Sequence, residues 1–176
     1  SLNISKNGMY GLVGDNGSWK TTILGLIDNI YDYDIGEILI NSMPINGFSP
    51  EEIRDKITYA SREPLVLPGD IWYNLKLGNL DISNDKIINA CKKTEIYQDI
   101  MGFESQYCTY LEVNGGNLSG GQLQKLSFAR ALLNPTSVHL FDEVISNMDI
   151  QSEYNICKIN KEISKNAIAL LISHRE

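Results

Sequence analysis

A glycine-rich segment near the N-terminus has the composition of a phosphate-binding loop. It reads GDNGSWKTT, Gly14–Thr22, and follows a short apolar run. Successive backbone N–H groups at the start of a helix can hold a phosphate group. Lys20 would then reach the terminal phosphates, and the hydroxyl of Thr21 would bind magnesium. The residues expected to contact a phosphate ligand are Asn16, Gly17, Ser18, Trp19, Lys20, Thr21 and Thr22.

The match has one defect, because the pattern requires glycine immediately before the lysine and this chain has Trp19. On the loop alone, an ordinary glycine-rich turn is an equally good interpretation. If the side chain removes one or two charge-assisted hydrogen bonds to phosphate, affinity falls by about tenfold to several thousandfold. If the indole instead packs away from the ligand on a neighbouring element, the backbone amides stay in place.

A second motif, LSGGQ at Leu118–Gln122, begins a predicted helix. Ser119 and Gln122 have the spacing of a capping box, which is a purely structural explanation. That explanation leaves out Gly120 and Gly121, which open the backbone so that an anion can approach the helix N-terminus.

A third motif, VHLFDE, places Asp142 and Glu143 at the end of an apolar strand, and LLISH near the C-terminus ends in His174. Each of these residues alone has an ordinary explanation, as a solvated strand end or a hydrogen-bonded histidine. His139, within the strand, is assigned to packing.

Short apolar runs alternate with helical stretches along the chain, which predicts an α/β fold with a mainly parallel sheet. The expected strands are 9–13, 37–40, 57–60, 138–141 and 167–172. The expected helices are 20–30, a short one after Ser49, a helical stretch over 70–101 with Ser83 as an N-cap, 119–133, and one between the last two strands.

Composition limits the class of protein. The 176 residues fit one domain, and no run approaches the roughly 18 apolar residues of a membrane span. A net charge of −7 disfavours nucleic acid as a partner. Three cysteines without paired spacing and the absence of a signal-peptide pattern indicate a cytoplasmic location.

Taken together, the motifs resemble the nucleotide-binding domain of an ATP-binding cassette (ABC) transporter. Lys20, Leu118, Asp142 and His174 follow one another in the order of that family, over nearly the whole chain. P-loop kinases and ring-forming ATPases are not expected to carry LSGGQ. The resemblance implies a P-loop NTPase core over residues 1–176, with a helical signature subdomain at about 70–133.

The resemblance also implies roles for these residues, with ATP and Mg²⁺ as ligands. Asp142 would hold magnesium through water, Glu143 would be the general base, and His174 would contact the γ-phosphate. Residues Ser119, Gly120, Gly121 and Gln122 would close on the ATP of a second nucleotide-binding domain, head to tail. Asp149 resembles an aspartate that links the two sites, with a helix cap as the alternative.

The segment 59–79 resembles the exporter pattern, and VNGGN before Leu118 is similar to the exporter X-loop, although its acidic residue, Glu112, is displaced. The implied partner is the transmembrane domain of an exporter, which places the chain at the inner face of the cell membrane. The transported substrate is not specified.

Three features depart from the family. Arg62 stands where the family has a glutamine; a guanidinium cannot bind magnesium, but it could pair with phosphate or an acidic neighbour. Trp19 replaces a glycine. The chain also begins after the adenine-stacking aromatic and stops just after His174, as expected of a piece of a longer protein or an abridged one.

These departures keep an alternative open: a degenerate, non-hydrolysing cassette with a regulatory or structural role. A soluble ABC ATPase of translation or DNA repair is disfavoured by the exporter-like segment and the acidic charge.

Overall fold

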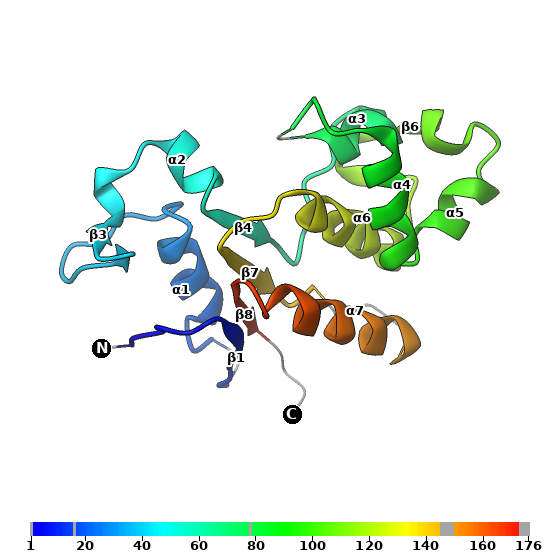
Figure 1. The fold of residues 1–176 in the computed structure, drawn as a ribbon. Coiled ribbons are helices and arrows are strands. Elements are labelled where there is room, and N and C mark those ends of the chain that lie inside the picture. Colours follow the sequence, from blue (N-terminus) through cyan, green and yellow to red (C-terminus); the bar gives the residue numbers. More distant parts are fainter. Residues whose placement is uncertain (1, 16, 78, 145–149, 173–176) are drawn as a thin grey trace.

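A parallel sheet of four strands forms the centre of the molecule (Figure 1). The computed structural model describes residues 2–15, 17–77, 79–144 and 150–172. The strand order is β1 (Gly8–Leu12), β8 (Ile168–Ile172), β7 (Val138–Asp142) and β4 (Ile57–Ala60). Strands distant in sequence therefore lie side by side, and the carboxyl ends of all four meet at one edge. The predicted α/β fold with a mainly parallel sheet is confirmed.

Helices and short hairpins surround this sheet. The helices are α1 (Lys20–Ile27), α2 (Pro50–Arg54), α3 (Ile71–Lys76), α4 (Asn84–Lys93), α5 (Tyr97–Gly102), α6 (Gly120–Leu133) and α7 (Ile150–Ile163). Two antiparallel pairs complete the strands: β2 (Leu39–Ile40) with β3 (Met43–Pro44), and β5 (Gly69–Asp70) with β6 (Tyr110–Leu111).

Alternation along the central strands divides the core into two layers. Leu140 of β7 and Leu170 of β8 pack with Leu24 of α1 on one face. The next residue in β7, Phe141, packs on the other face with Phe128 of α6. Because successive strand side chains point to opposite faces, α1 covers one side of the sheet, and α6 and α7 cover the other.

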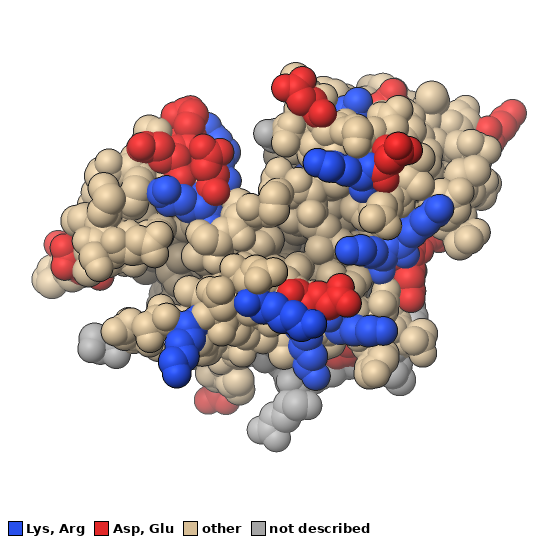
Figure 2. Space-filling view, in the orientation of Figure 1, with Lys and Arg blue, Asp and Glu red and all other residues tan. Residues whose placement is uncertain are grey.

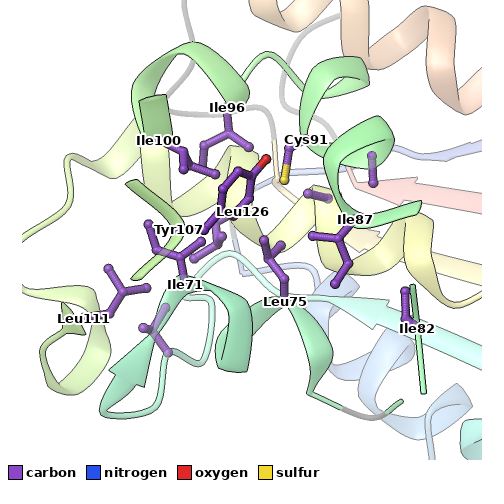
Figure 3. Close-up of a cluster of buried hydrophobic side chains, with 13 residues drawn as sticks. Ile71, Leu75, Ile82, Ile87, Cys91, Ile96, Ile100, Tyr107, Leu111 and Leu126 are labelled. Carbon is purple, nitrogen blue, oxygen red and sulfur yellow. The ribbon is translucent and has the colours of Figure 1, made fainter. Parts of the chain in front are cut away.

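The helices α3 to α6 enclose a separate apolar cluster, drawn in Figure 3. Its fully buried members include Ile71, Leu75, Ile87, Ile100, Leu111 and Leu126. We call residues 66–133, which build this cluster, the helical lobe. In Figure 1 this lobe lies to one side of the sheet, and α6 is the helix of the lobe that is nearest to the strands.

Two polar side chains hold the backbone segment through which the chain enters the helical lobe. Asn74 is completely buried; its amide donates to the carbonyl of Leu67 at 2.9 Å and accepts from the N–H of Leu67 at 3.0 Å. Arg130 of α6 donates to the carbonyls of Leu65 at 2.8 Å and Asn74 at 2.9 Å. Burial lowers the pKa of Arg130 to about 10, which still leaves it charged near neutral pH.

Several predicted boundaries were wrong. The strand expected at 37–40 is only Leu39–Ile40, and α1 ends at Ile27 rather than residue 30. Ser83 occupies the N-cap of α4, but its side chain makes no capping hydrogen bond. The helical stretch expected over 70–101 forms three helices, α3, α4 and α5. By contrast, Ser49 caps α2 with a complete capping box.

Among the described residues, no helix is both long and apolar enough to span a bilayer. On the face drawn in Figure 2, basic and acidic side chains are interspersed rather than gathered by sign.

Candidate functional site

The loop before α1 curves around the ammonium group of Lys20. The nitrogen donates to the carbonyls of Gly14 and Asp15, both at 2.8 Å, and to the hydroxyl of Ser18 at 3.4 Å. Gly17 has a φ of 81°, a conformation that glycine adopts without strain. Lys20 is only 7% exposed, and its ammonium group lies at the centre of a loop suited to an anion. Asn16 lies outside the described residues.

Trp19 keeps the turn that its position requires. Its φ of 61° and ψ of 22° lie in the left-handed region, and its carbonyl accepts from the N–H of Ile23 at 2.9 Å, which begins α1. The predicted alternative in which the indole packs on a neighbouring element was wrong, because Trp19 is 74% exposed. Left-handed backbone costs a residue with a side chain about 1–2 kcal/mol.

A buried carboxylate joins the loop to the sheet. Asp142, at the end of β7, is 3% exposed and accepts two hydroxyl hydrogen bonds. Thr21 of α1 donates to Oδ1 at 3.1 Å, and Tyr59 of β4 donates to Oδ2 at 3.0 Å. Burial, with the adjacent charge of Asp142, raises the pKa of Tyr59 well above its usual range, so the phenol remains a donor.

Sequence reasoning missed Tyr59. The available signal was a tyrosine in a short apolar strand whose C-terminal end points to the same sheet edge as Asp142. The hydrogen bond from Tyr59 to Asp142 depends on the pairing of β4 with β7, in which Tyr59 lies opposite Leu140.

Glu143, the predicted general base, is held by the residue at the glutamine position. The Nη1 atom of Arg62 lies 3.1 Å from Oε2 of Glu143. The side chain of Glu143 is 11% exposed, and that of Arg62 is 62% exposed. The backbone of Glu143 is left-handed, with a φ of 52°. An unusual backbone conformation in a residue with a side chain is a feature that gathers at functional sites.

The LSGGQ segment forms the N-terminus of α6 and makes the predicted capping box. Ser119 accepts from the N–H of Gln122 at 3.2 Å, and Gln122 accepts from the N–H of Ser119 at 2.9 Å. The amide of Gln122 also donates to Asp99 of α5 at 3.1 Å. Ser119 and Gly120 are exposed and Gly121 is half-buried, so this helix end is accessible from solvent.

The remaining predicted residues divide into two groups. Thr22 lies half-buried in the first turn of α1. His174 and Asp149 lie outside the described residues. The structure therefore joins Lys20, Thr21, Asp142 and Glu143 at one sheet edge.

The chemistry of these groups fits a magnesium-bound phosphate ligand. The hydroxyl of Thr21 and the carboxylate of Asp142 are hard oxygen ligands of the kind that Mg²⁺ prefers. Lys20 would offer a cation to phosphate oxygens, and Glu143 has a carboxylate that could accept a proton.

Comparison with known proteins agrees with this geometry. The family model described as ABC transporter matches residues 1–146. ABC transporter B family member 1 of Dictyostelium discoideum is 35% identical over 99% of this chain and 19% of its own length. Leptomycin B resistance protein pmd1 of Schizosaccharomyces pombe is 32% identical over 99% of this chain and 13% of its own length. The chain thus spans less than a fifth of these two relatives.

A solved structure of a bacterial Atm1-family ABC exporter with ATP bound is similar in fold. The TM-score is 0.91 at 27% identity, over 96% of this chain and 30% of that one. The predicted resemblance is confirmed by all three comparisons. The chain therefore belongs to the ABC transporter family, where it corresponds to the nucleotide-binding domain of exporters.

Proposed function

We propose that this chain binds ATP with Mg²⁺ and hydrolyses it to power export of a substrate across a membrane. The observation that carries the proposal is the hydrogen bond that Thr21 donates to Asp142. Thr21 directly follows Lys20 in the chain. It brings a cation, a hydroxyl and a carboxylate from distant parts of the chain to one point. That set suits phosphoryl transfer, where positioning and charge neutralisation supply most of the catalysis.

Each group has a distinct task in this proposal. Lys20 would exchange its contacts with the loop carbonyls for phosphate oxygens, and Thr21 and Asp142 would hold the metal. Bound magnesium would neutralise charge on the phosphates. Glu143 accepts the proton of the attacking water, and His174 is proposed to contact the γ-phosphate.

The proposal includes two partners. The exposed start of α6, Ser119 and Gly120, would complete the site of a second nucleotide-binding domain in a head-to-tail dimer. The transmembrane domain of an exporter would be the other partner, at the cytoplasmic face of the membrane. This partner is supported by relatives that are several times longer than this chain.

A second candidate function is a cassette that binds nucleotide without hydrolysing it. The ion pair of Arg62 with Glu143 favours it, because this contact engages the proposed base. The variants below separate the two functions.

Replacing Trp19 by glycine should relieve the left-handed backbone and clear the loop. We expect Trp19→Gly to raise the free energy of unfolding by up to about 1 kcal/mol and to tighten ATP binding at least tenfold. Calorimetry and thermal melting measure the two effects. Ser42→Gly is a matched control, since Ser42 is exposed with a φ of 64° in the turn between β2 and β3. Equal affinity in wild type and Trp19→Gly would show that the indole does not obstruct phosphate.

Replacing Glu143 by glutamine removes the proton acceptor but keeps the shape of the side chain. We expect hydrolysis to fall by about 10² to 10⁴ while ATP affinity changes less than about threefold. Phosphate release and calorimetry measure the two quantities. Glu63→Gln, which neutralises an exposed carboxylate next to Arg62, should hydrolyse ATP like wild type. Unchanged turnover in Glu143→Gln would remove Glu143 from the mechanism.

Hydrolysis should depend on protein concentration if a complete site needs the α6 N-terminus of a second molecule. We expect the rate per molecule to rise with concentration in the low range and then level off. Turnover assays across a dilution series, with the mass in ATP measured by light scattering, provide the test. A constant rate per molecule from a species of monomeric mass would contradict the shared site.

A further inference from the structure

We propose that Asp99 is a positioning residue for the LSGGQ segment. It fixes the orientation of the Gln122 amide, and through it the arrangement of the donor groups at the start of α6. The inference rests on the part of the proposed function in which the start of α6 completes the ATP site of a second molecule. It is carried by the hydrogen bonds of Gln122, the placement of Asp99, and the donors that these contacts leave for an anion.

The side-chain amide of Gln122 is held at both of its ends. Its oxygen accepts from the N–H of Ser119 at 2.9 Å, and its nitrogen donates to Oδ1 of Asp99 at 3.1 Å. An amide has one accepting end and one donating end, whereas a carboxylate only accepts. Asp99 therefore selects the orientation in which the amide oxygen faces Ser119, as the capping box requires. The reversed amide would place its NH2 group against the N–H of Ser119.

The backbone around Asp99 is anchored in the apolar cluster of the helical lobe. Asp99 lies in the first turn of α5, between Ile96 and Ile100, which are both buried in the cluster drawn in Figure 3. Its Oδ2 lies 3.9 Å from Nζ of Lys125, one helical turn after Gln122 on α6. An ion pair of that length with a side chain that is 30% exposed stabilises little. The hydrogen bond to Gln122 is therefore the contact by which Asp99 acts on α6.

Three donors at the start of α6 are left for an anion. The N–H groups of Gly120 and Gly121 have no acceptor within the helix, as in the first turn of any α-helix. The hydroxyl oxygen of Ser119 accepts from the N–H of Gln122, and its own proton has no acceptor in the part of the chain that the structure describes. The capping box fixes these donors relative to one another. Asp99 thus acts on a phosphate ligand through Gln122, without touching the ligand itself.

The charge of Asp99 has the opposite effect on an anion, because it repels a phosphate near α6 and Lys125 offsets only part of that repulsion. Asp99→Asn separates the two effects, since asparagine keeps an acceptor for Gln122 and removes the charge. Asp99→Ala removes both. A positioning role therefore requires the alanine variant to be impaired and the asparagine variant to resemble wild type.

The first test uses the dependence of hydrolysis on protein concentration. We expect Asp99→Ala to raise the concentration that gives half of the maximal rate per molecule about threefold to tenfold, and Asp99→Asn to change it less than about twofold. ATP affinity measured by calorimetry at low protein concentration should stay that of wild type, because Asp99 is not part of the molecule's own phosphate-binding loop. Glu104→Ala is a matched control, since it removes an exposed carboxylate elsewhere in the helical lobe.

A mixing experiment assigns the effect to the second molecule. Lys20→Ala removes the cation of the phosphate-binding loop but keeps the LSGGQ segment and Asp99. When Asp99→Ala pairs head to tail with Lys20→Ala, one site combines an intact loop with an intact start of α6. At a concentration where Asp99→Ala alone is slow, we expect added Lys20→Ala to raise hydrolysis at least about twofold. The double variant Lys20→Ala with Asp99→Ala should give no such rise.

A third measurement does not need hydrolysis. In nitrogen-15 NMR spectra of the chain, the side-chain NH2 signals of Gln122 are identified by their loss in Gln122→Ala. We expect these signals to shift in Asp99→Ala and to exchange faster with water, because the amide loses its acceptor. Glu104→Ala should leave them unchanged.

The outcomes separate the inference from the proposed function. Impaired pairing in Asp99→Ala, with Asp99→Asn close to wild type and rescue on mixing, supports the positioning role. Equal loss in both variants, no loss in either, or no rescue on mixing, while wild type hydrolyses ATP, overturns it and leaves the proposed function standing. Unchanged Gln122 signals in Asp99→Ala overturn it as well. Absence of hydrolysis in wild type at every concentration overturns the proposed function, and the role of Asp99 at a shared ATP site with it.

Discussion

The carboxylate of Asp142 connects the three segments that make up the site. It ends β7 in the interior of the sheet, and it accepts hydrogen bonds from Thr21 at the start of α1 and Tyr59 in β4. Burying a charge is costly unless hydrogen bonds compensate it, and the two hydroxyl groups supply that compensation. The arrangement requires β7 to lie between β4 and β8, so that parallel carboxyl ends meet at one edge. The proposed phosphate-binding loop is therefore attached to the sheet through Asp142, the proposed metal ligand.

Two residues of the candidate site, Trp19 and Glu143, adopt left-handed backbone conformations. Trp19 precedes the lysine and Glu143 follows Asp142, with φ values of 61° and 52°. Each conformation costs roughly 1–2 kcal/mol for a residue with a side chain, and the surrounding fold must supply that energy. In Trp19 the turn persists although the usual glycine is absent. In Glu143 the conformation presents the carboxylate to Arg62.

Much of this arrangement could be predicted from sequence because it depends on local signals. Apolar runs located β1, β4, β7 and β8, and the spacing of Ser119 and Gln122 located the start of α6 and its capping box. The contacts of Tyr59 and Arg62 could not be located in this way. They depend on which strands are neighbours and on the path of the chain after β4, and neither has a local pattern. The two-residue strands β5 and β6 are too short to show any periodicity.

Arg62, which replaces the glutamine of the family, contacts the proposed base, Glu143. The residue lies between a sheet edge fixed by Asp142 and a lobe fixed by Asn74 and Arg130. In this chain, the guanidinium of Arg62 lies 3.1 Å from the carboxylate of Glu143, the proposed base.

The proposed role of Asp142 is tested most directly by the effect of magnesium on ATP affinity in wild type and Asp142→Asn. Calorimetric titrations would be done with excess Mg²⁺ and again with a chelator. If Asp142 organises the metal-phosphate site, magnesium tightens ATP binding to wild type, and most of that gain disappears in Asp142→Asn, while affinities in the chelator stay similar. An equal gain from magnesium in both proteins, or no binding of ATP to wild type, would contradict the account.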